Sequence, residues 1–265
     1  MTLLDTLSAR RPEVGPADPG VAVRLSGVTK RFGDGPVVLD DISLSVAEGE
    51  FVCLLGASGC GKSTLLNLVA GLDQATAGTV SVPGGRAALM FQESALLPWL
   101  TAAQNVELAL RLRGVGRRER REQASELLTL VRLKDAGGKL VHELSGGMRQ
   151  RVALARALAQ ETGVLLMDEP FASLDAITRD VLHEELVRLR TSQALTVVFV
   201  THNVREAVRL GDRVVLLSSR PGRIAQTYDV AIGTPRRIES PDVARLSVEI
   251  TDDLRAEIRR HAGQP

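Results

Sequence analysis

The chain has 265 residues, of which 44% are hydrophobic and 25% are charged, and its formal net charge is +1. This length and apolar content are expected for one large α/β domain, or for a core that carries a subdomain. The near-neutral charge excludes a broad basic surface for nucleic acid. No apolar run is long enough to span a bilayer, and residues 1–20 lack the apolar core of a secretory signal. We therefore predict a disordered leader over residues 1–20.

The first half of the chain mixes strand and helix patterns. Residues 21–25 and 42–46 alternate apolar and polar side chains, as half-buried strands do. Residues 51–55 form a continuous apolar run, which is typical of a strand buried on both faces. Short strands are predicted at residues 78–82 and 87–91. Between about residues 95 and 160 the pattern becomes helical, with a predicted N-cap at Thr101, so we expect a helical subdomain inserted in an α/β core.

The α/β pattern resumes after this insertion. It predicts strands at residues 164–167, 195–200 and 213–217, and helices at residues 180–190 and 204–210. A turn at Pro221 and Gly222 follows, and a last helix is predicted from about residue 251. These patterns predict a main domain over residues 21–217 and a short C-terminal extension over residues 218–265.

A glycine-rich segment lies between the apolar strand at residues 51–55 and a helical pattern. It consists of Gly56, Ala57, Ser58, Gly59, Cys60, Gly61, Lys62, Ser63 and Thr64. Its glycines let backbone N–H groups converge on a polyphosphate, and the helix that follows adds the positive end of its dipole. Lys62 is expected to reach the β- and γ-phosphates, and the Ser63 hydroxyl to bind Mg²⁺. The segment therefore predicts a nucleoside triphosphate site.

Polar residues follow three of the predicted strands. Asp168 and Glu169 end the run at residues 164–167, His202 follows the next strand, and Gln92 follows residues 87–91. Because ligands of open α/β sheets lie beyond the carboxyl ends of strands, these side chains should face the phosphate site. We expect Asp168 to hold Mg²⁺ and Glu169 to polarise the water that attacks the γ-phosphate. The Gln92 amide can bind Mg²⁺ or water there.

The two cysteines are predicted to be free thiols. Cys53 lies on a predicted buried strand and Cys60 in the phosphate loop, so neither is placed as half of a disulfide, which suits a reducing cytoplasm. Because Cys60 lies in this loop, we expect a bulky thiol reagent to block nucleotide turnover and bound nucleotide to shield the thiol.

Residues 144–150 read Leu-Ser-Gly-Gly-Met-Arg-Gln, and their serine and glycines open a helix, where N–H groups and a hydroxyl form a second anion site. The segment resembles the signature motif of ABC-transporter ATP-binding subunits, and the other motifs between residues 21 and 217 occur in the order of that family. The resemblance implies a P-loop NTPase core with an antiparallel β subdomain and an inserted helical subdomain. It also implies that His202 contacts the γ-phosphate of ATP.

In this family two copies pair head to tail, each signature motif closing over the ATP of the other copy. The residues that the resemblance assigns to this contact are Ser145, Gly146, Gly147 and Gln150. Asp175 would contact the partner copy across the dimer. Because all the phosphate and catalytic motifs are present, a homodimer with two competent sites is expected. Phe32 lies where the family has an aromatic residue on adenine, and both stacking and core packing stay open for it.

The chain also resembles one branch of the importer ATPases. Residues 96–100, Leu-Leu-Pro-Trp-Leu, and residues 218–224 are similar to the nitrate/sulfonate/taurine branch. This similarity implies import of a small oxyanion or sulfonate, with transmembrane permease subunits and an extracytoplasmic solute-binding protein as partners. The ATPase would lie peripherally on the cytoplasmic face of the inner membrane. The segment that contains Trp99 either forms a groove for a partner helix or packs in the core.

Two other functional classes were weighed against an importer subunit. One is a soluble, non-transport ABC ATPase that acts on nucleic acid or ribosomes, but such relatives tend to carry coiled-coil insertions or two cassettes, which this chain lacks. The other is a P-loop kinase, which would leave the signature motif unexplained. The arginines of residues 111–121 alternate with glutamates, so we interpret them as a solvated helical face and expect no nucleic-acid partner. The identity of the solute is not encoded in this chain.

Overall fold

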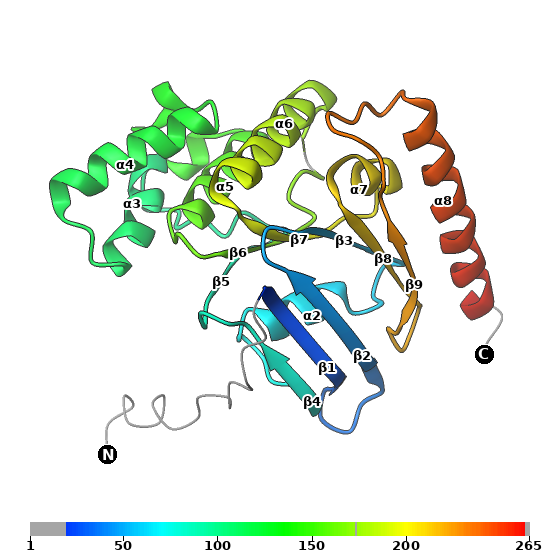
Figure 1. Cartoon of the computed structure of the whole chain (residues 1–265). Coiled ribbons are helices and arrows are strands. Elements are labelled where there is room, and N and C mark those ends of the chain that lie inside the picture. The colour runs from blue at the N-terminus through cyan, green and yellow to red at the C-terminus, as the bar shows by residue number, and fades with distance from the viewer. Residues whose placement is uncertain (1–19, 173, 263–265) are drawn as a thin grey trace, which may run out of the picture.

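A computed structural model describes residues 20–172 and 174–262 of the chain, and a mixed sheet forms its centre (Figure 1). In this part of the chain the sheet has six strands, all parallel except the last one along its edge. In spatial order they are β5 (Ala87–Met90), β6 (Val164–Asp168), β7 (Thr196–Val200), β3 (Phe51–Gly56), β8 (Arg213–Leu217) and β9 (Ile224–Asp229). The central strands are apolar and buried on both faces, as the continuous apolar runs predicted.

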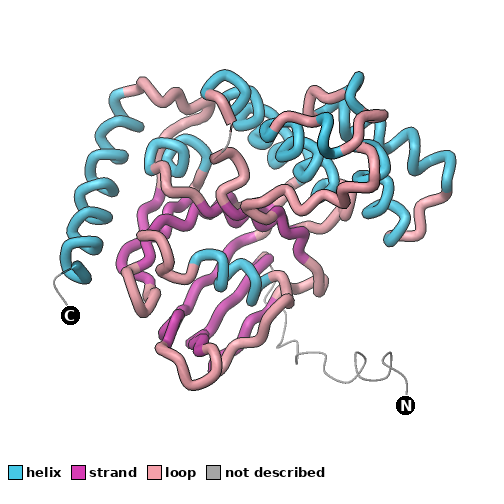
Figure 2. Tube along the Cα trace, turned by 180° about the vertical axis from the view of Figure 1, so that it is seen from behind, coloured by secondary structure: helices cyan, strands magenta, loops and turns pink. Residues whose placement is uncertain are grey.

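A smaller antiparallel sheet packs below the main one, as the family resemblance implied. Its order is β2 (Val37–Ala47), β1 (Val21–Arg31) and β4 (Ala77–Ser81). β2 keeps the predicted alternation, with Ile42, Leu44 and Val46 buried and the serines between them exposed. Both long strands extend beyond the predicted ranges, because their pairing continues to the hairpin, where Arg31 pairs with Val37. Helix α2 (Lys62–Val69) contacts strands of both sheets and lies between them (Figure 2).

The inserted segment is helical, as predicted. It contains α3 (Ala102–Leu112), α4 (Arg117–Leu130), two short 3₁₀ turns at Lys134–Ala136 and Val141–Glu143, and α5 (Gly146–Leu158). Thr101 is the N-cap of α3, since its hydroxyl accepts from the Gln104 N–H at 3.2 Å while the Gln104 side chain accepts from the Thr101 N–H at 3.0 Å. α5 packs against α3, α4 and β5, so it joins the helical subdomain to the edge of the main sheet.

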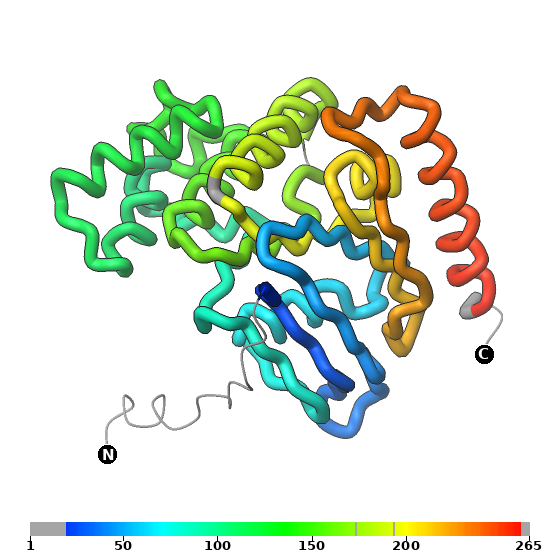
Figure 3. Tube along the Cα trace, viewed as in Figure 1, coloured from blue at the N-terminus to red at the C-terminus, as the bar shows by residue number. Residues whose placement is uncertain are grey.

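The chain after β6 closes the other side of the molecule. It forms α6 (Ala176–Gln193), α7 (Val204–Leu210) and α8 (Pro241–Ala262). α6 begins four residues before its predicted start because Asp175 caps it. α8 begins ten residues before the predicted residue 251 and packs on α7, at the end of the molecule opposite the helical subdomain (Figure 3).

Strand β9 was not predicted, because its residues are mostly exposed and polar, as edge strands are. It pairs antiparallel with β8, and its Tyr228 hydroxyl donates to Asp253 of α8 at 2.5 Å. The residues predicted as a C-terminal extension from residue 218 therefore complete one edge of the main sheet. The predicted leader, except Gly20, lies outside the described residues. None of the helices in residues 20–172 and 174–262 is long and apolar enough to cross a lipid bilayer.

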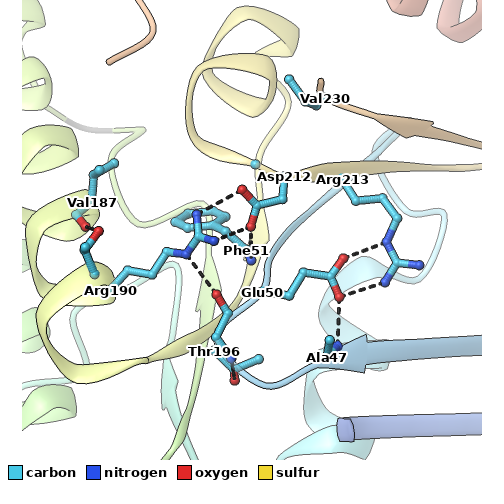
Figure 4. A network of polar contacts seen from close by, with 12 residues as sticks. Ala47, Glu50, Phe51, Val187, Arg190, Thr196, Asp212, Arg213 and Val230 are labelled. Atoms are coloured by element: carbon cyan, nitrogen blue, oxygen red, sulfur yellow. Dashed lines mark hydrogen bonds and ion pairs between the residues drawn. The ribbon is translucent and has the colours of Figure 1, made fainter. Parts of the chain in front are cut away.

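Two carboxylates tie together the amino ends of the central strands (Figure 4). Asp212 accepts from the Phe51 N–H at 3.0 Å and pairs with Arg190 of α6 at 2.5 Å. The guanidinium of Arg190 also donates to the Gly49 carbonyl at 2.9 Å. Glu50 pairs with Arg213 at 2.8 Å. Because these bonds join α6, β3 and β8, they hold the sheet at the edge opposite the glycine-rich loop.

Replacing Asp212 by Asn tests this network. The change removes the charge that faces Arg190 and Arg236, whose side chains are 24% and 5% exposed. We expect the free energy of unfolding to fall by about 1–3 kcal/mol, less than for a fully buried pair, because the partners are partly solvated. Urea unfolding measures the change. Asp252→Asn, which affects an exposed pair on α8, is the matched control, and equal midpoints for the two variants would contradict the proposed role.

Candidate functional site

Four parallel strands end side by side at one edge of the main sheet. β3 leads into the glycine-rich loop, β6 into Glu169, β7 into Thr201 and β5 into the segment that begins at Phe91. The loops after these strands therefore meet at the carboxyl edge, as expected for ligand sites of open α/β sheets. The sequence-predicted residues all lie at this edge: the end of the phosphate-loop segment (residues 62–64) opens α2, Asp168 ends β6, and Glu169, His202 and Gln92 lie on the loops.

The glycine-rich loop curls onto the start of α2. Gly61 is the N-cap of this helix and adopts φ 101°, a left-handed conformation that favours glycine. A Cβ atom at Gly61 would lie 2.6 Å from the Leu39 side chain, so β2 of the smaller sheet packs directly on the loop. The Lys62 ammonium is buried and donates to the carbonyls of Gly56 at 2.8 Å and Ala57 at 2.9 Å. The loop thus holds one cation beside the converging backbone N–H groups of a helix N-terminus.

Ser63 and Asp168 meet across the edge. The Ser63 hydroxyl donates to the Asp168 carboxylate, while burial raises the pKa of Asp168 above its usual range. Nearby Glu169 raises this pKa further, whereas Ser63 and Lys62 oppose the shift. A hydroxyl and a carboxylate beside a phosphate-binding loop are oxygen donors of the kind that Mg²⁺ takes together with substrate phosphates. The donor set therefore fits this ion.

Glu169 and His202 form a pair at the mouth of the site. Nδ1 of His202 lies 3.2 Å from Oε2 of Glu169, and the two side chains are 68% and 21% exposed. Glu169 has φ 44°, and its N–H donates to the carbonyl of Val200 at 3.0 Å. The loops after β6 and β7 are therefore joined by a backbone hydrogen bond and by the contact between these two side chains. A carboxylate and an imidazole at this distance can share a proton and orient a water molecule.

The segment after Gln92 is attached to the helical subdomain. Nε2 of Gln150, on α5, donates to the Gln92 carbonyl at 2.6 Å. The Arg156 guanidinium, also on α5, donates to the carbonyls of Ser94 at 2.9 Å and Ala95 at 2.7 Å. Asn105 of α3 is fully buried and bonds both the N–H and the carbonyl of Leu97.

These bonds leave the Gln92 side chain exposed at the site while its backbone belongs to the helical subdomain. Sequence reasoning missed Arg156 and Asn105. The only signal for them was a polar residue inside an otherwise apolar helix pattern. For Gln150, predicted to face a partner copy, the structure shows a buried side chain that contacts the Gln92 segment of its own chain.

The start of α5 lies beside the loop before α6. Ser145 is the N-cap of α5, and its hydroxyl accepts from the Met148 N–H at 3.2 Å. Ser145 and Gly146 are exposed. A Cβ atom at Gly147 would lie 2.9 Å from Leu174, so glycine permits the close approach of these two segments. Asp175 is exposed and caps α6, and its bonds to Thr178 lower the pKa of its carboxyl.

The structure decides between two interpretations of the aromatic residues. Phe32 is 52% exposed, so core packing was the wrong alternative for it; the Lys30 ammonium lies 4.6 Å from the centre of its ring. Trp99 is 70% exposed, so it does not pack in the core either, although Leu96 of the same segment does.

The turn at residues 218–223, predicted at Pro221 and Gly222 without a role in the site, contacts the phosphate loop. Nε of Arg220 lies 3.5 Å from the Gly59 carbonyl. Gly222 bonds β2 on both sides, accepting from the Asp40 N–H at 3.0 Å and donating to the Val38 carbonyl at 2.8 Å. The turn therefore joins the phosphate loop to the smaller sheet.

Cys60 is 1% exposed, with its sulfur 3.8 Å from the Lys62 ammonium. Burial raises the pKa of its thiol above the usual range, and Lys62 offsets only part of this effect. Because a buried, protonated thiol is a poor nucleophile, the structure argues against ready modification of Cys60 by a bulky thiol reagent, on which the expected block of turnover depends.

Known proteins share this architecture and sequence. A family model described as ABC transporter matches residues 39–172. The chain is 48% identical over 241 residues to the aliphatic sulfonates import ATP-binding protein SsuB 1 of Agrobacterium fabrum, covering 90% of this chain and 86% of that protein. It is 46% identical over 237 residues to the taurine import ATP-binding protein TauB of Mesorhizobium japonicum, with 84% and 92% covered.

Solved structures are similar as well. A dimeric ATP-binding cassette in a post-hydrolysis state, bound to ADP and Pi, has a TM-score of 0.73 and 33% identity to this chain. The match covers 80% of this chain and all of that one. The fold of a P-loop core with an antiparallel β subdomain and an inserted helical subdomain is thereby confirmed.

The burial of Cys60 predicts its reactivity. In the native protein we expect a maleimide to label Cys60 at least about 10-fold more slowly than free cysteine at neutral pH, with a rate that still rises above about pH 9. Peptide mass spectrometry after timed quenching measures this rate. Cys53, which is also buried and has a raised pKa, is the internal control and should stay unlabelled until urea is added. Rapid stoichiometric labelling of Cys60 in the folded protein would be the opposite result.

Proposed function

This chain belongs to the ABC transporter family and is an ATPase, and from that premise we propose that it powers an importer of small sulfonates or related oxyanions. The observation that carries the proposal is the 48% identity over 90% of the chain to an aliphatic sulfonates import subunit. The same relatives do not favour the alternative of a non-transport ATPase. The residues of the site support the chemistry as follows.

Lys62 and the backbone N–H groups of residues 56–64 bind the phosphates of ATP. The ammonium exchanges its bonds to the loop carbonyls for bonds to the β- and γ-phosphates, which carry more negative charge. Ser63, Asp168 and Gln92 would hold Mg²⁺. When bound, this ion neutralises charge on the phosphates. Phe32, exposed at the end of β1, stacks on the adenine ring.

Glu169 and His202 carry the hydrolytic step. The Glu169 carboxylate accepts a hydrogen bond from the attacking water and so orients its oxygen toward the γ-phosphorus. His202 bonds Glu169 through Nδ1, which fixes the carboxylate. In the imidazolium form both ring nitrogens are donors, so Nε2–H would then donate to a γ-phosphate oxygen. Each residue thus limits the positions that the other can occupy, as positioning at a phosphoryl-transfer site requires.

A second copy of the chain completes each site. Ser145, Gly146 and Gly147 open α5 with N–H groups that point out of the helix, and these close over the γ-phosphate bound by the partner. The face beside them includes Asp175 and Ile177, which is 80% exposed. Gln150, whose side chain is buried, supports α5 by joining this helix to the Gln92 segment of its own chain.

The membrane partner contacts the segment after Gln92. Phe91 and Trp99 are 42% and 70% exposed, and the backbone between them is bonded to α3 and α5. Exposed aromatic side chains on a firmly held backbone suit a permease helix. A peripheral position on the cytoplasmic face of the inner membrane follows, with an extracytoplasmic solute-binding protein acting through the permease.

Reconstitution tests this function. The complex captured with the tagged chain would be placed in liposomes with candidate solute-binding proteins, and ATP hydrolysis measured with an alkanesulfonate, taurine, nitrate or no solute. We expect stimulation by a sulfonate-loaded binding protein. Stimulation by RNA or ribosomes, with no membrane partner captured, would instead support the non-transport alternative.

The Glu169→Gln variant tests the catalytic assignment. The amide cannot accept the proton of water, so we expect kcat to fall by about 10²- to 10⁴-fold while ATP binding is kept. Because hydrolysis no longer separates the two copies, size-exclusion chromatography in ATP should show a dimer. Asp180→Asn, an exposed change on α6, is the control and should elute as the unmodified chain does. A monomer at saturating ATP would contradict the proposed sandwich.

Phe32→Ala tests adenine stacking. Because the ring is half-exposed, its loss should leave the unfolding midpoint unchanged, while the Kd for ATP rises about 3- to 10-fold, corresponding to about 0.5–1.5 kcal/mol of lost stacking. Fluorescence titration with a labelled ATP analogue measures the Kd. Phe32→Tyr keeps the ring and should bind as the unmodified chain does. Equal affinities for Phe32→Ala and Phe32→Tyr would exclude stacking.

A further inference from the structure

A chain of buried polar groups lies directly behind His202. Oε1 of Glu206, on α7, is 2.7 Å from Nε2 of His183, on α6. These side chains are 8% and 1% exposed. The other carboxylate oxygen of Glu206 accepts a hydrogen bond from the Thr201 hydroxyl. Neither Glu206 nor His183 belongs to a sequence motif considered above, and both interrupt apolar helix faces.

The Thr201 hydroxyl makes a second bond on the far side of His202. It accepts from the Asn203 N–H at 3.0 Å. The Asn203 side chain in turn caps α7 by accepting from the Glu206 N–H at 3.3 Å. The residues on both sides of His202 are therefore anchored to one carboxylate. The direction in which the imidazole of His202 leaves the backbone depends on this anchor.

His183 also contacts the loop that carries Glu169. Its ring packs edge-on against Phe171, with 5.2 Å between ring centres. Phe171 lies two residues after Glu169 and is 2% exposed. One buried imidazole thus contacts the loop of Glu169 through Phe171 and the loop of His202 through Glu206. A small cavity is lined by both loops, with Glu169, His202 and Glu206 among its lining residues.

The hydrogen-bond arrangement determines the form of His183. Its Nδ1 is buried and has no hydrogen-bond partner within the described residues. A proton on Nδ1 would be a buried donor without an acceptor, whereas a proton on Nε2 is donated to a carboxylate oxygen. Nε2 of His183 therefore carries a proton, and this N–H acts as a fixed donor to Glu206.

We propose that His183 and Glu206 are positioning residues for ATP hydrolysis, which hold His202 at hydrogen-bond distance from Glu169. This inference rests on the proposed function of that pair. The donor from His183 fixes one carboxylate oxygen, so the other stays directed at Thr201. Without this donor the carboxylate can rotate away or recruit water, and the loop at residues 201–203 loses its anchor. α6, which begins at Asp175 of the dimer face, carries the imidazole, so closure of the dimer acts on His202 through the same bond.

Two substitutions separate positioning from packing. His183→Leu fills the site without a donor, whereas the amide nitrogen of His183→Gln can replace Nε2. We expect His183→Leu to lower kcat by between about 10- and 100-fold, the effect of a displaced catalytic group, with little change in KM for ATP. His183→Gln should restore most of the rate. Glu184→Gln, on the exposed face of α6, is the matched control. Equal losses in the Leu and Gln variants, or a loss that follows a lower unfolding midpoint, would overturn the proposal.

A spectroscopic measurement does not depend on turnover. The chain has 4 histidines, so ¹⁵N-histidine labelling gives few resonances to assign. In the unmodified protein His183 should show a slowly exchanging proton on Nε2. In His183→Leu the ring signals of His202 should shift, while those of exposed His142 stay in place.

A His183 protonated on Nδ1 alone would overturn the inference, as would unchanged His202 signals in the Leu variant. These outcomes are distinct from failure of the proposed function. An unmodified protein without ATPase activity would refute the assigned reaction, yet the spectra would still report whether His183 holds the His202 loop.

Discussion

The parallel alignment of β5, β6, β7 and β3 is the constraint on which the rest of the structure depends. Each strand ends at the same edge, so residues more than a hundred positions apart in the chain become neighbours. The strands are buried and bonded along their length, which leaves their last residues little freedom. Lys62, Asp168 and His202 therefore need only short loops to reach one substrate. The carboxylate network at the opposite edge ties β3 to β8 and α6.

Hydrogen bonds from side chains to backbone carbonyls attach the helical subdomain to the main sheet. The segment between Gln92 and Thr101 has its carbonyls bonded by side chains of α3 and α5, while the Gln92 side chain remains at the edge of the main sheet. Movement of this side chain toward bound nucleotide would carry a backbone that is tied to the whole subdomain. Trp99 lies on the same segment. If the membrane partner contacts Trp99 as proposed, a signal from the phosphate site and a force from that partner would act on one stretch of chain.

The sequence predicted those parts whose geometry is local. The phosphate loop, the N-cap at Thr101 and the alternation of β2 depend on neighbours in the chain, and all appear where expected. Strand β9 was missed because an edge strand that is mostly exposed to solvent carries no apolar periodicity. His183 and Glu206 were missed for the opposite reason: each has a polar side chain on an apolar helix face, and only the packing of α6 against α7 supplies the partner. The burial of Gln150 likewise depends on a contact with a segment 58 residues away.

The turn at residues 218–223 connects the phosphate loop, the smaller sheet and the edge of the main sheet. It contacts Gly59, bonds β2 through Gly222 and continues into β9. It lies well beyond the stretch that matches the family model, residues 39–172. A cassette trimmed to residues 39–172 would lose this turn while keeping the whole glycine-rich loop and the acidic pair. A cassette that is moved between transporters and keeps these contacts must therefore include Arg223 and strand β9.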